Sequence, residues 1–200
     1  MKPIRSAPAS SFDAAYYERW YEDMETRSYI ADKAVRFVLS YVEHMDASVR
    51  TVLDVGCGLG FWKKAFSTYA KNVRYSGVEF SPYLCEKFGW TCGDVRTYAP
   101  GRTFDLVVCQ GVLQYLPDGD CEVAIENLSR LARRFLYLEV LTAADAREVC
   151  ASDDTDFGVF VRRAEWYARQ LARHFVNLGG GLYAKPAMRR HYYELWCTDP

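Results

Sequence analysis

The chain has 200 residues, of which 50% are hydrophobic and 16% are aromatic, and its formal net charge is −1. This composition excludes an intrinsically disordered chain, because it can bury a substantial apolar core. The near balance of acidic and basic residues provides no strong field to attract nucleic acid or an anionic membrane. We therefore expect a single domain over residues 1–200 whose partners include neither nucleic acid nor a membrane.

The sequence shows no pattern typical of a secretory signal or a membrane-spanning segment. Residues 1–11 contain Lys2 and Arg5 but lack the apolar stretch of a secretory signal. No apolar run elsewhere approaches the length of a membrane span. These observations predict a cytoplasmic protein and leave its oligomeric state open.

The cysteine and histidine patterns argue against disulfides and metal sites. The cysteines are odd in number and contain no C-x-x-C pair, so we expect buried, reduced thiols. His44, His174 and His191 are far apart and lack metal-ligand spacing, so no bound metal is expected. The seven cysteines occupy positions 57, 85, 92, 109, 121, 150 and 197.

Residues 11–44 are rich in aromatic side chains, and the apolar positions between 35 and 42 have helical spacing. Tyr16, Tyr17 and Tyr21 are close together in this segment, and two interpretations of them stay open. They either line a ligand pocket or pack a helix against the rest of the fold.

The segment that follows has the strongest pattern in the chain. Residues 51–55 form an apolar run with one acid and predict a buried parallel strand. Gly56, Gly58 and Gly60 then allow the backbone to turn with positive φ and let a ligand approach closely. A helix is expected from Phe61. This order places helix N–H groups beside whatever binds at the carboxyl end of the strand.

The rest of the chain continues to alternate strands with helices. Glu79 closes the second predicted strand, one β-α-β unit after Asp54, where an acid suits the vicinal hydroxyls of a nucleoside. The predicted strands occupy residues 73–80, 90–92, 104–109 and 135–141, and the predicted helices between them occupy 82–88 and 117–134.

The pattern beyond residue 141 is weaker. Residues 142–158 are polar and acidic and predict a loop, which either borders an acceptor pocket or is a solvated surface segment. The remaining expected elements are a helix at 164–175, a glycine turn at 179–181, and a terminal antiparallel pair of strands at 182–184 and 192–197.

Four motifs in this order resemble those of class I S-adenosylmethionine (SAM)-dependent methyltransferases. Residues 52–60 match an acid followed by G-x-G-x-G, and the other three motifs are at 77–82, 93–95 and 104–116. The resemblance implies an α/β, Rossmann-like, seven-stranded and mostly parallel sheet of order 3-2-1-4-5-7-6, with its last strand antiparallel and helices on both faces. It also implies an N-terminal helical cap (1–48), a SAM-binding half (49–141) and a substrate-side, C-terminal half (142–200).

The resemblance further implies roles for individual residues. Glu79 would accept the ribose hydroxyls, and Asp94 would face the adenine amino group. Tyr115 and Glu139 are the catalytic candidates, because no histidine lies at the carboxyl end of a strand. The expected cofactor-binding residues are Asp54, Gly56, Cys57, Gly58, Gly60, Glu79, Phe80, Asp94, Val95, Gln110 and Gly111, and the expected substrate-binding residues are Tyr16, Tyr17, Tyr21 and Gln114.

The implied activity is transfer of the SAM methyl group to a small-molecule acceptor by in-line displacement at the sulfonium, with S-adenosylhomocysteine (SAH) as product. Such a reaction depends mainly on holding donor and acceptor aligned in a site closed to water.

The alternatives are a methyltransferase for a protein or peptide, a non-catalytic SAM-binding protein, and an NAD-dependent oxidoreductase. The alternating glycines count against the last, because a dinucleotide fingerprint is G-x-G-x-x-G. The sequence also lacks the acid-Pro-Pro-Tyr motif of some amino-methylating relatives after residue 109. That absence argues against the exocyclic-amine and amide acceptors that depend on it.

Overall fold

The computed structural model describes residues 7–21, 23–150 and 155–198. Its centre is a seven-stranded sheet in the order β3-β2-β1-β4-β5-β7-β6, which confirms the expected strand order. Neighbouring strands from β3 to β5 are parallel, whereas β7 is antiparallel to both β5 and β6. The strands are β1 (Thr51–Val55), β2 (Arg74–Glu79), β3 (Thr91–Cys92), β4 (Phe104–Gln110), β5 (Ala132–Glu139), β6 (Val176–Asn177) and β7 (Leu182–Ala184).

Helices cover both faces of the sheet, as expected. Successive residues of a strand point to opposite faces, so β1 contributes to two separate apolar clusters. Val52 packs with residues of α2 and α3, whereas Leu53 packs with residues of α5 and α7. Among the described residues, no helix combines the length and the apolarity needed to cross a bilayer. The helices are α1 (Ala14–Trp20), α2 (Met24–His44), α3 (Phe61–Tyr69), α4 (Pro82–Phe88), α5 (Asp118–Leu131), α6 (Ala143–Glu148) and α7 (Ala164–Leu171).

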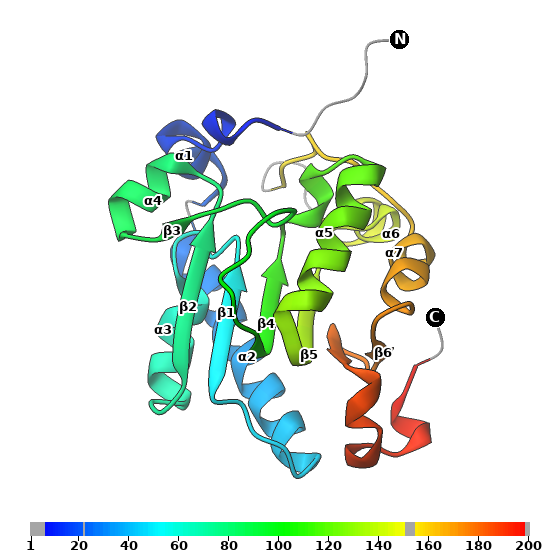
Figure 1. The fold of residues 1–200 in the computed structure, drawn as a ribbon. Helices are drawn as coiled ribbons and strands as arrows, with labels where there is room; N and C mark the ends of the chain where they lie inside the picture. The colour runs from blue at the N-terminus through cyan, green and yellow to red at the C-terminus, as the bar shows by residue number, and fades with distance from the viewer. Residues whose placement is uncertain (1–6, 22, 151–154, 199–200) are drawn as a thin grey trace.

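The N-terminal segment lies at the end of the sheet where the parallel strands finish. Figure 1 shows α1 near α4, at the end of the sheet toward which the arrows of β1, β2 and β4 point. Asp13 caps α1 by accepting a hydrogen bond from the Tyr16 amide, 3.0 Å away. The segment is therefore attached where ligands bind in open α/β folds.

The prediction of a strand at 192–197 is wrong. A short 3-10 helix, Glu194–Trp196, occupies this part of the chain, and β7 pairs with β6 instead. The connection from β6 to β7 contains three consecutive glycines with positive φ, at positions 179 to 181. These glycines let the chain reverse within four residues, so β6 forms a hairpin with β7 before the C-terminal segment reaches the sheet.

The segment after β5 also differs from the prediction. Part of the predicted loop at 142–158 is the helix α6, and residues 151–154 lie outside the described residues. Thr142 and Asp145 form a capping box, in which each side chain accepts a hydrogen bond from the other residue's backbone N–H. This box supplies local stabilisation that the low hydrophobicity of the segment does not reveal.

The prediction that all cysteines are reduced thiols is wrong for one pair. Cys85 and Cys92 form a disulfide, with Cα atoms 5.7 Å apart. Cys85 is on α4, and Cys92 is on β3, which follows α4 after a turn at Gly89 in the left-handed conformation. Chain reversal at this turn brings the two cysteines together across seven positions. The free cysteines are 57, 109, 121, 150 and 197.

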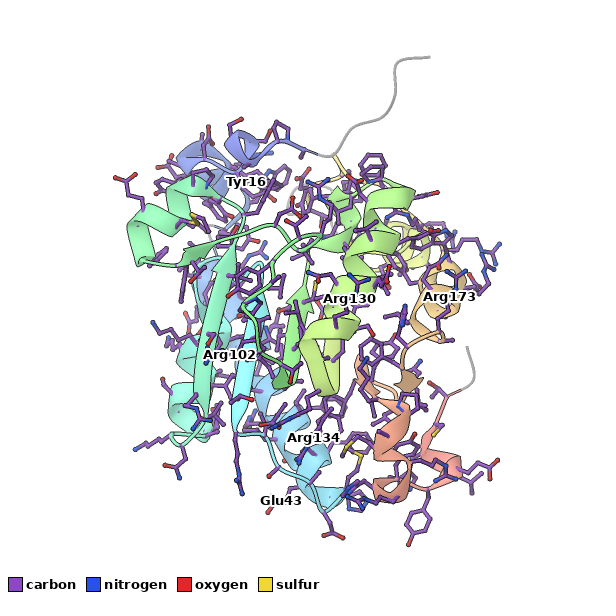
Figure 2. The ribbon with its side chains drawn as sticks, viewed as in Figure 1. Tyr16, Glu43, Arg102, Arg130, Arg134 and Arg173 are labelled. Atoms are coloured by element: carbon purple, nitrogen blue, oxygen red, sulfur yellow. A yellow bond between two sulfur atoms is a disulfide. The ribbon has the colours of Figure 1, made fainter. Side chains whose placement is uncertain are left out.

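A buried carboxylate joins three strands at the amino ends of the sheet. Asp105 on β4 is 1% exposed and accepts hydrogen bonds from the Arg50 amide, the Thr51 amide and the Thr51 hydroxyl, each at 3.0 Å. Arg133 on β5 also donates to it. Burial alone would raise the pKa of Asp105, but the hydrogen bonds from Arg133, Arg50 and Thr51 outweigh it and hold the pKa below its usual value. Arg134, whose Nε is 3.8 Å from the same carboxylate, marks this lower end of the sheet in Figure 2.

We expect Asp105→Asn to lower the free energy of unfolding by about 3 kcal/mol at pH 7, because it removes one partner of a buried ion pair. A carboxyl whose pKa is depressed by folding stabilises the protein above its unfolded pKa of about 4 and loses this contribution as the pH falls. The difference between variant and wild type should therefore shrink below pH 4. Urea unfolding at pH 7 and at pH 3.5 measures it, and a difference that is equal at both would contradict this assignment.

Asp54 lies near the opposite end of β1, and folding raises its pKa, whereas it lowers the pKa of Asp105. It is 2% exposed and accepts a hydrogen bond from the Tyr75 hydroxyl, which lies beside it on β2. Burial raises the pKa of Asp54 to about 7, the Tyr75 hydrogen bond opposes this rise, and the Glu79 carboxylate adds to it. Folding therefore favours the protonated form of Asp54 in the absence of a ligand.

We expect the unliganded Asp54→Asn variant to gain stability relative to the wild type as the pH rises. A carboxyl whose pKa is raised by folding destabilises the native state progressively between its unfolded and folded pKa values, and asparagine has no such titration. Between pH 5.5 and 8.5 the relative gain should be about 2 kcal/mol. Thermal or urea unfolding across this pH range tests it, with Asp32→Asn on α2 as the control for a lost carboxylate. A constant difference would show that Asp54 stays ionised.

Candidate functional site

The turn between β1 and α3 can be built only from glycine at its first position. Gly56 has φ of +73°, and a Cβ added there would lie 2.3 Å from a methyl carbon of Val112. The amide of Gly56 donates to the carbonyl of Val78 on β2, at 2.8 Å. The turn is thus fastened to β2 on one side and packed against the segment after β4 on the other.

Glu79, the last residue of β2, fixes the same turn through its carboxylate. It is 5% exposed, and its Oε2 accepts a hydrogen bond from the Gly58 amide at 2.8 Å. Its Oε1 accepts from the amides of Phe80 and Ser81 at 2.8 and 2.9 Å. Three amide donors hold this carboxylate in place, so its two oxygens are orientated before any ligand arrives.

Two adjoining cavities lie at the carboxyl ends of the parallel strands. The first cavity, beside β2 and β3, is lined by the expected residues Tyr17, Glu79, Phe80, Asp94 and Val95. The second cavity, about 530 Å³ in volume beside β5 and α2, is lined by the expected residues Asp54, Cys57, Gln114 and Glu139. Seven expected residues line both: Tyr16, Tyr21, Gly56, Gly58, Gln110, Gly111 and Tyr115.

Gly60 is the one expected residue that lines neither of the two cavities. Its backbone is in the left-handed conformation at the start of α3, with φ of +81°. A Cβ at this position would lie 3.0 Å from the Trp90 ring. The third glycine therefore serves the entry into α3 and its packing against Trp90.

Asp94 is paired with an arginine that the sequence analysis did not identify. Arg96 donates from its guanidinium to both carboxylate oxygens of Asp94 and also pairs with Asp120. Burial favours the neutral form of Asp94, but the hydrogen bonds from Arg96 outweigh burial and lower its pKa. Arg96 itself lines the first cavity, so this end of the cavity has a fixed ion pair.

A chain of hydrogen bonds orientates Glu139 at the carboxyl end of β5. The Trp62 indole N–H donates to the side-chain oxygen Oε1 of Gln110 at 2.7 Å, which turns the side-chain nitrogen Nε2 of Gln110 toward Glu139. That nitrogen donates to Glu139 Oε1 at 3.0 Å, and the Tyr137 hydroxyl donates to Oε2 at 3.1 Å. Both oxygens of Glu139 thus accept hydrogen bonds, which fix the orientation of its carboxyl group.

A second series of hydrogen bonds connects the N-terminal helix α1 to the loop after α6. The hydroxyls of Tyr16 and Tyr115 are 2.6 Å apart, and the Tyr115 hydroxyl donates to Asp156 Oδ2 at 3.2 Å. Because a carboxylate can only accept, Tyr115 uses its hydrogen on Asp156, and Tyr16 is the donor to Tyr115. Burial raises the pKa of both tyrosines far above the neutral range, so both are uncharged. Figure 2 shows Tyr16 at the upper end of the sheet.

The N-terminal segment closes over this chain with aromatic contacts. The Phe12 ring meets the rings of Tyr16 and Tyr115 edge to face, with centroids 5.1 Å apart in each case. The Ser81 hydroxyl donates to the Phe12 carbonyl. Of the two interpretations of Tyr16, Tyr17 and Tyr21, the geometry favours the one in which their side chains line a cavity.

Sequence reasoning missed Phe12, Arg96 and Asp156. Phe12 belongs to the aromatic segment, so its composition was a usable signal. Asp156 belongs to the acidic segment 142–158, for which a pocket border was one of the two interpretations, but its partner Tyr115 is 41 positions away. Arg96 gave no signal, although its partner Asp94 is only two positions away. Among the described residues, no group of three or more histidine, cysteine or acidic side chains is arranged to hold a metal ion.

Comparison with known proteins finds sequence similarity over part of the chain. A family model described as a methyltransferase domain matches residues 52–134. The chain is 31% identical over 93 residues to a trans-aconitate 2-methyltransferase of Azoarcus sp., a match covering 43% of this chain and 36% of the relative. A trans-aconitate 2-methyltransferase of Methylobacterium radiotolerans is 28% identical over 116 residues, covering 54% and 41%. The chain thus spans less than half the length of these curated relatives.

Solved structures share the fold over most of the chain. The N-methyltransferase NodS from Bradyrhizobium japonicum, in complex with SAH, superposes with a TM-score of 0.61 at 17% identity, covering 90% of this chain and 100% of its own. Magnesium protoporphyrin IX methyltransferase from Synechocystis, with bound SAM, gives a TM-score of 0.65 at 14% identity, covering 91% and 99%. The protein therefore has the fold of class I SAM-dependent methyltransferases, and its residues 52–134 match the methyltransferase-domain model.

Proposed function

We propose that this protein binds SAM across the two cavities and transfers its methyl group to a small molecule held in the second cavity. The proposal rests on one observation: Gly56 and Gly58 line both adjoining cavities, and Glu79 and Asp94 line the first of them. The named relatives support it, because each is described as a methyltransferase and two of the similar structures contain SAM or SAH.

The first cavity would hold the adenosine part of the cofactor. Glu79 has both oxygens fixed by amides and retains lone pairs for two ribose hydroxyls. Asp94, held by Arg96, would accept from the adenine amino group, and Phe80 and Val95 would contact the base. These groups bind and orientate the cofactor.

The region shared by the two cavities would hold the methionine part. Gly56 and Gly58 allow close backbone approach there, and Gln110 and Gly111 border the same space. Asp54 and Cys57 line the second cavity beside them. When bound, SAM supplies an electrophilic methyl group on a positively charged sulfur. The contribution of the protein is to align the acceptor with that methyl group and to exclude water.

We further propose that residues 1–200 act as a single cytoplasmic domain, with residues 1–48 as the cap and a small molecule as partner. A protein or peptide acceptor is the second candidate. It is disfavoured because Phe12, Tyr16 and Tyr115 line the first cavity with Phe12 packed edge to face against the other two rings, which reduces the space for a bulky chain. A non-catalytic SAM-binding protein would bind SAH but transfer no methyl group.

We expect calorimetric titration to show tight binding of SAH and no binding of NAD⁺. Glu79→Gln should weaken SAH binding by about 10- to 100-fold, because it replaces charge-assisted hydrogen bonds to the ribose with neutral ones. Glu86→Gln, at an exposed position on α4, is the matched control and should bind as the wild type does. Unfolding curves of both variants establish that they are folded. Binding of NAD⁺ instead, or of neither compound, would reject the proposed function.

A further inference from the structure

The wall of the second cavity is rich in hydrogen-bond acceptors. Four acidic side chains line it: Asp54, Glu139, Asp145 and Asp156. Arg27 is the basic residue that lines it among the described residues, and its guanidinium is engaged elsewhere. It donates to the Trp20 carbonyl at 2.6 Å and stacks 4.3 Å from the centroid of the Tyr21 ring. The formal charge of the wall is therefore negative.

A further acceptor in the same wall lacks a donor. The Oε1 atom of Gln114 is buried, and no described residue donates a hydrogen bond to it. A buried polar atom without a partner costs free energy, and a bound ligand with N–H groups would remove that cost. The cavity therefore calls for a ligand that donates hydrogen bonds and carries positive charge.

We infer that the methyl acceptor is a primary or secondary amine, which binds as an ammonium ion between Glu139, Asp156 and Gln114. The inference rests on the proposed function and specifies its substrate class. An ammonium group has up to three donors and a positive charge, which complement the fixed Glu139 carboxylate and the orphan Gln114 oxygen. A carboxylate or phosphate acceptor would be repelled by the acidic side chains of this wall.

The structure also contains a route for the proton that an ammonium must lose before its nitrogen can attack. The Tyr16 oxygen receives no hydrogen bond from a described residue and is the open end of the Tyr16–Tyr115–Asp156 chain. The ammonium gives a proton to Tyr16, Tyr16 passes its own to Tyr115, and Tyr115 passes its own to Asp156. The nitrogen lone pair then forms the N–C bond while the C–S bond of the donor breaks and its electron pair stays on sulfur. Asp156 afterwards releases the proton to water.

The groups that face this chain set its pH dependence. Tyr21 and Arg27 interact electrostatically with Tyr16 from the α1–α2 region, and Glu79 interacts with Tyr21 from β2. Because burial keeps Tyr16 and Tyr115 protonated, neither tyrosine stores the proton, and Asp156 is its destination.

We would test the substrate class with two matched sets of compounds, each on one scaffold. Benzylamine, benzyl alcohol and benzoate form the first set, and glucosamine, glucose and glucuronate form the second. Binding to the SAH-loaded protein is measured by calorimetry, and turnover with SAM by mass spectrometry of the methylated product. At least one amine should bind and be methylated on nitrogen, whereas the matched alcohols and carboxylates should not.

Variants separate binding from proton transfer. Glu139→Gln should weaken amine binding about tenfold and leave SAH binding unchanged. Asp156→Asn should lower kcat/KM for the amine about 100-fold at pH 7, and the deficit should shrink to a few-fold at pH 9.5, where the free amine needs no base. Glu148→Gln, an exposed acid on α6, and Tyr29→Phe, an exposed tyrosine on α2, are the matched controls for a lost carboxylate and a lost hydroxyl.

The outcomes are distinguishable. Protein that binds no SAH would reject the proposed function itself. Protein that binds SAH but prefers the carboxylates, or neither binds nor methylates any of the amines, would overturn the inference alone. An equal deficit of Asp156→Asn at both pH values would show that Asp156 is structural and would overturn the proton route.

Discussion

The site depends on one carboxylate that is buried at the end of β2. Glu79 accepts amide hydrogen bonds from the glycine turn after β1 and from the start of α4, so it joins two loops that the chain forms separately. A buried carboxylate requires such donors, because an unpaired charge at low exposure is strongly destabilising. The requirement that stabilises Glu79 thus also sets the shape of the first cavity.

The strongest sequence patterns predicted the elements that surround this carboxylate. The strand at 51–55 and the helix at 82–88 are observed with the predicted bounds, because an unbroken apolar run and a proline at the first helical turn are local signals. The expected site residues gather at one place except Gly60, because the carboxyl ends of parallel strands share one edge of the sheet.

The features that sequence reasoning missed are short or long-range. A two-residue strand such as β6 is too short to show an alternation of apolar and polar residues. The segment of α6 is polar, so its hydrophobicity pattern gave no sign of the helix that Thr142 and Asp145 cap. The Cys85–Cys92 disulfide depends on how tightly the chain turns after α4. The contact of Tyr115 with Asp156 joins positions 41 residues apart, which no local pattern specifies.

The two cavities share part of their walls, but each also has residues of its own. Glu79 and Asp94 line the first cavity and not the second, whereas Trp20, Arg27 and Ile30 from the N-terminal stretch line the second and not the first. Substitutions at Trp20, Arg27 and Ile30 would therefore change the wall of the second cavity without replacing a residue that lines the first. The wall of the second cavity can thus change in sequence independently of Glu79 and Asp94, and variation in the two cavities is only partly linked.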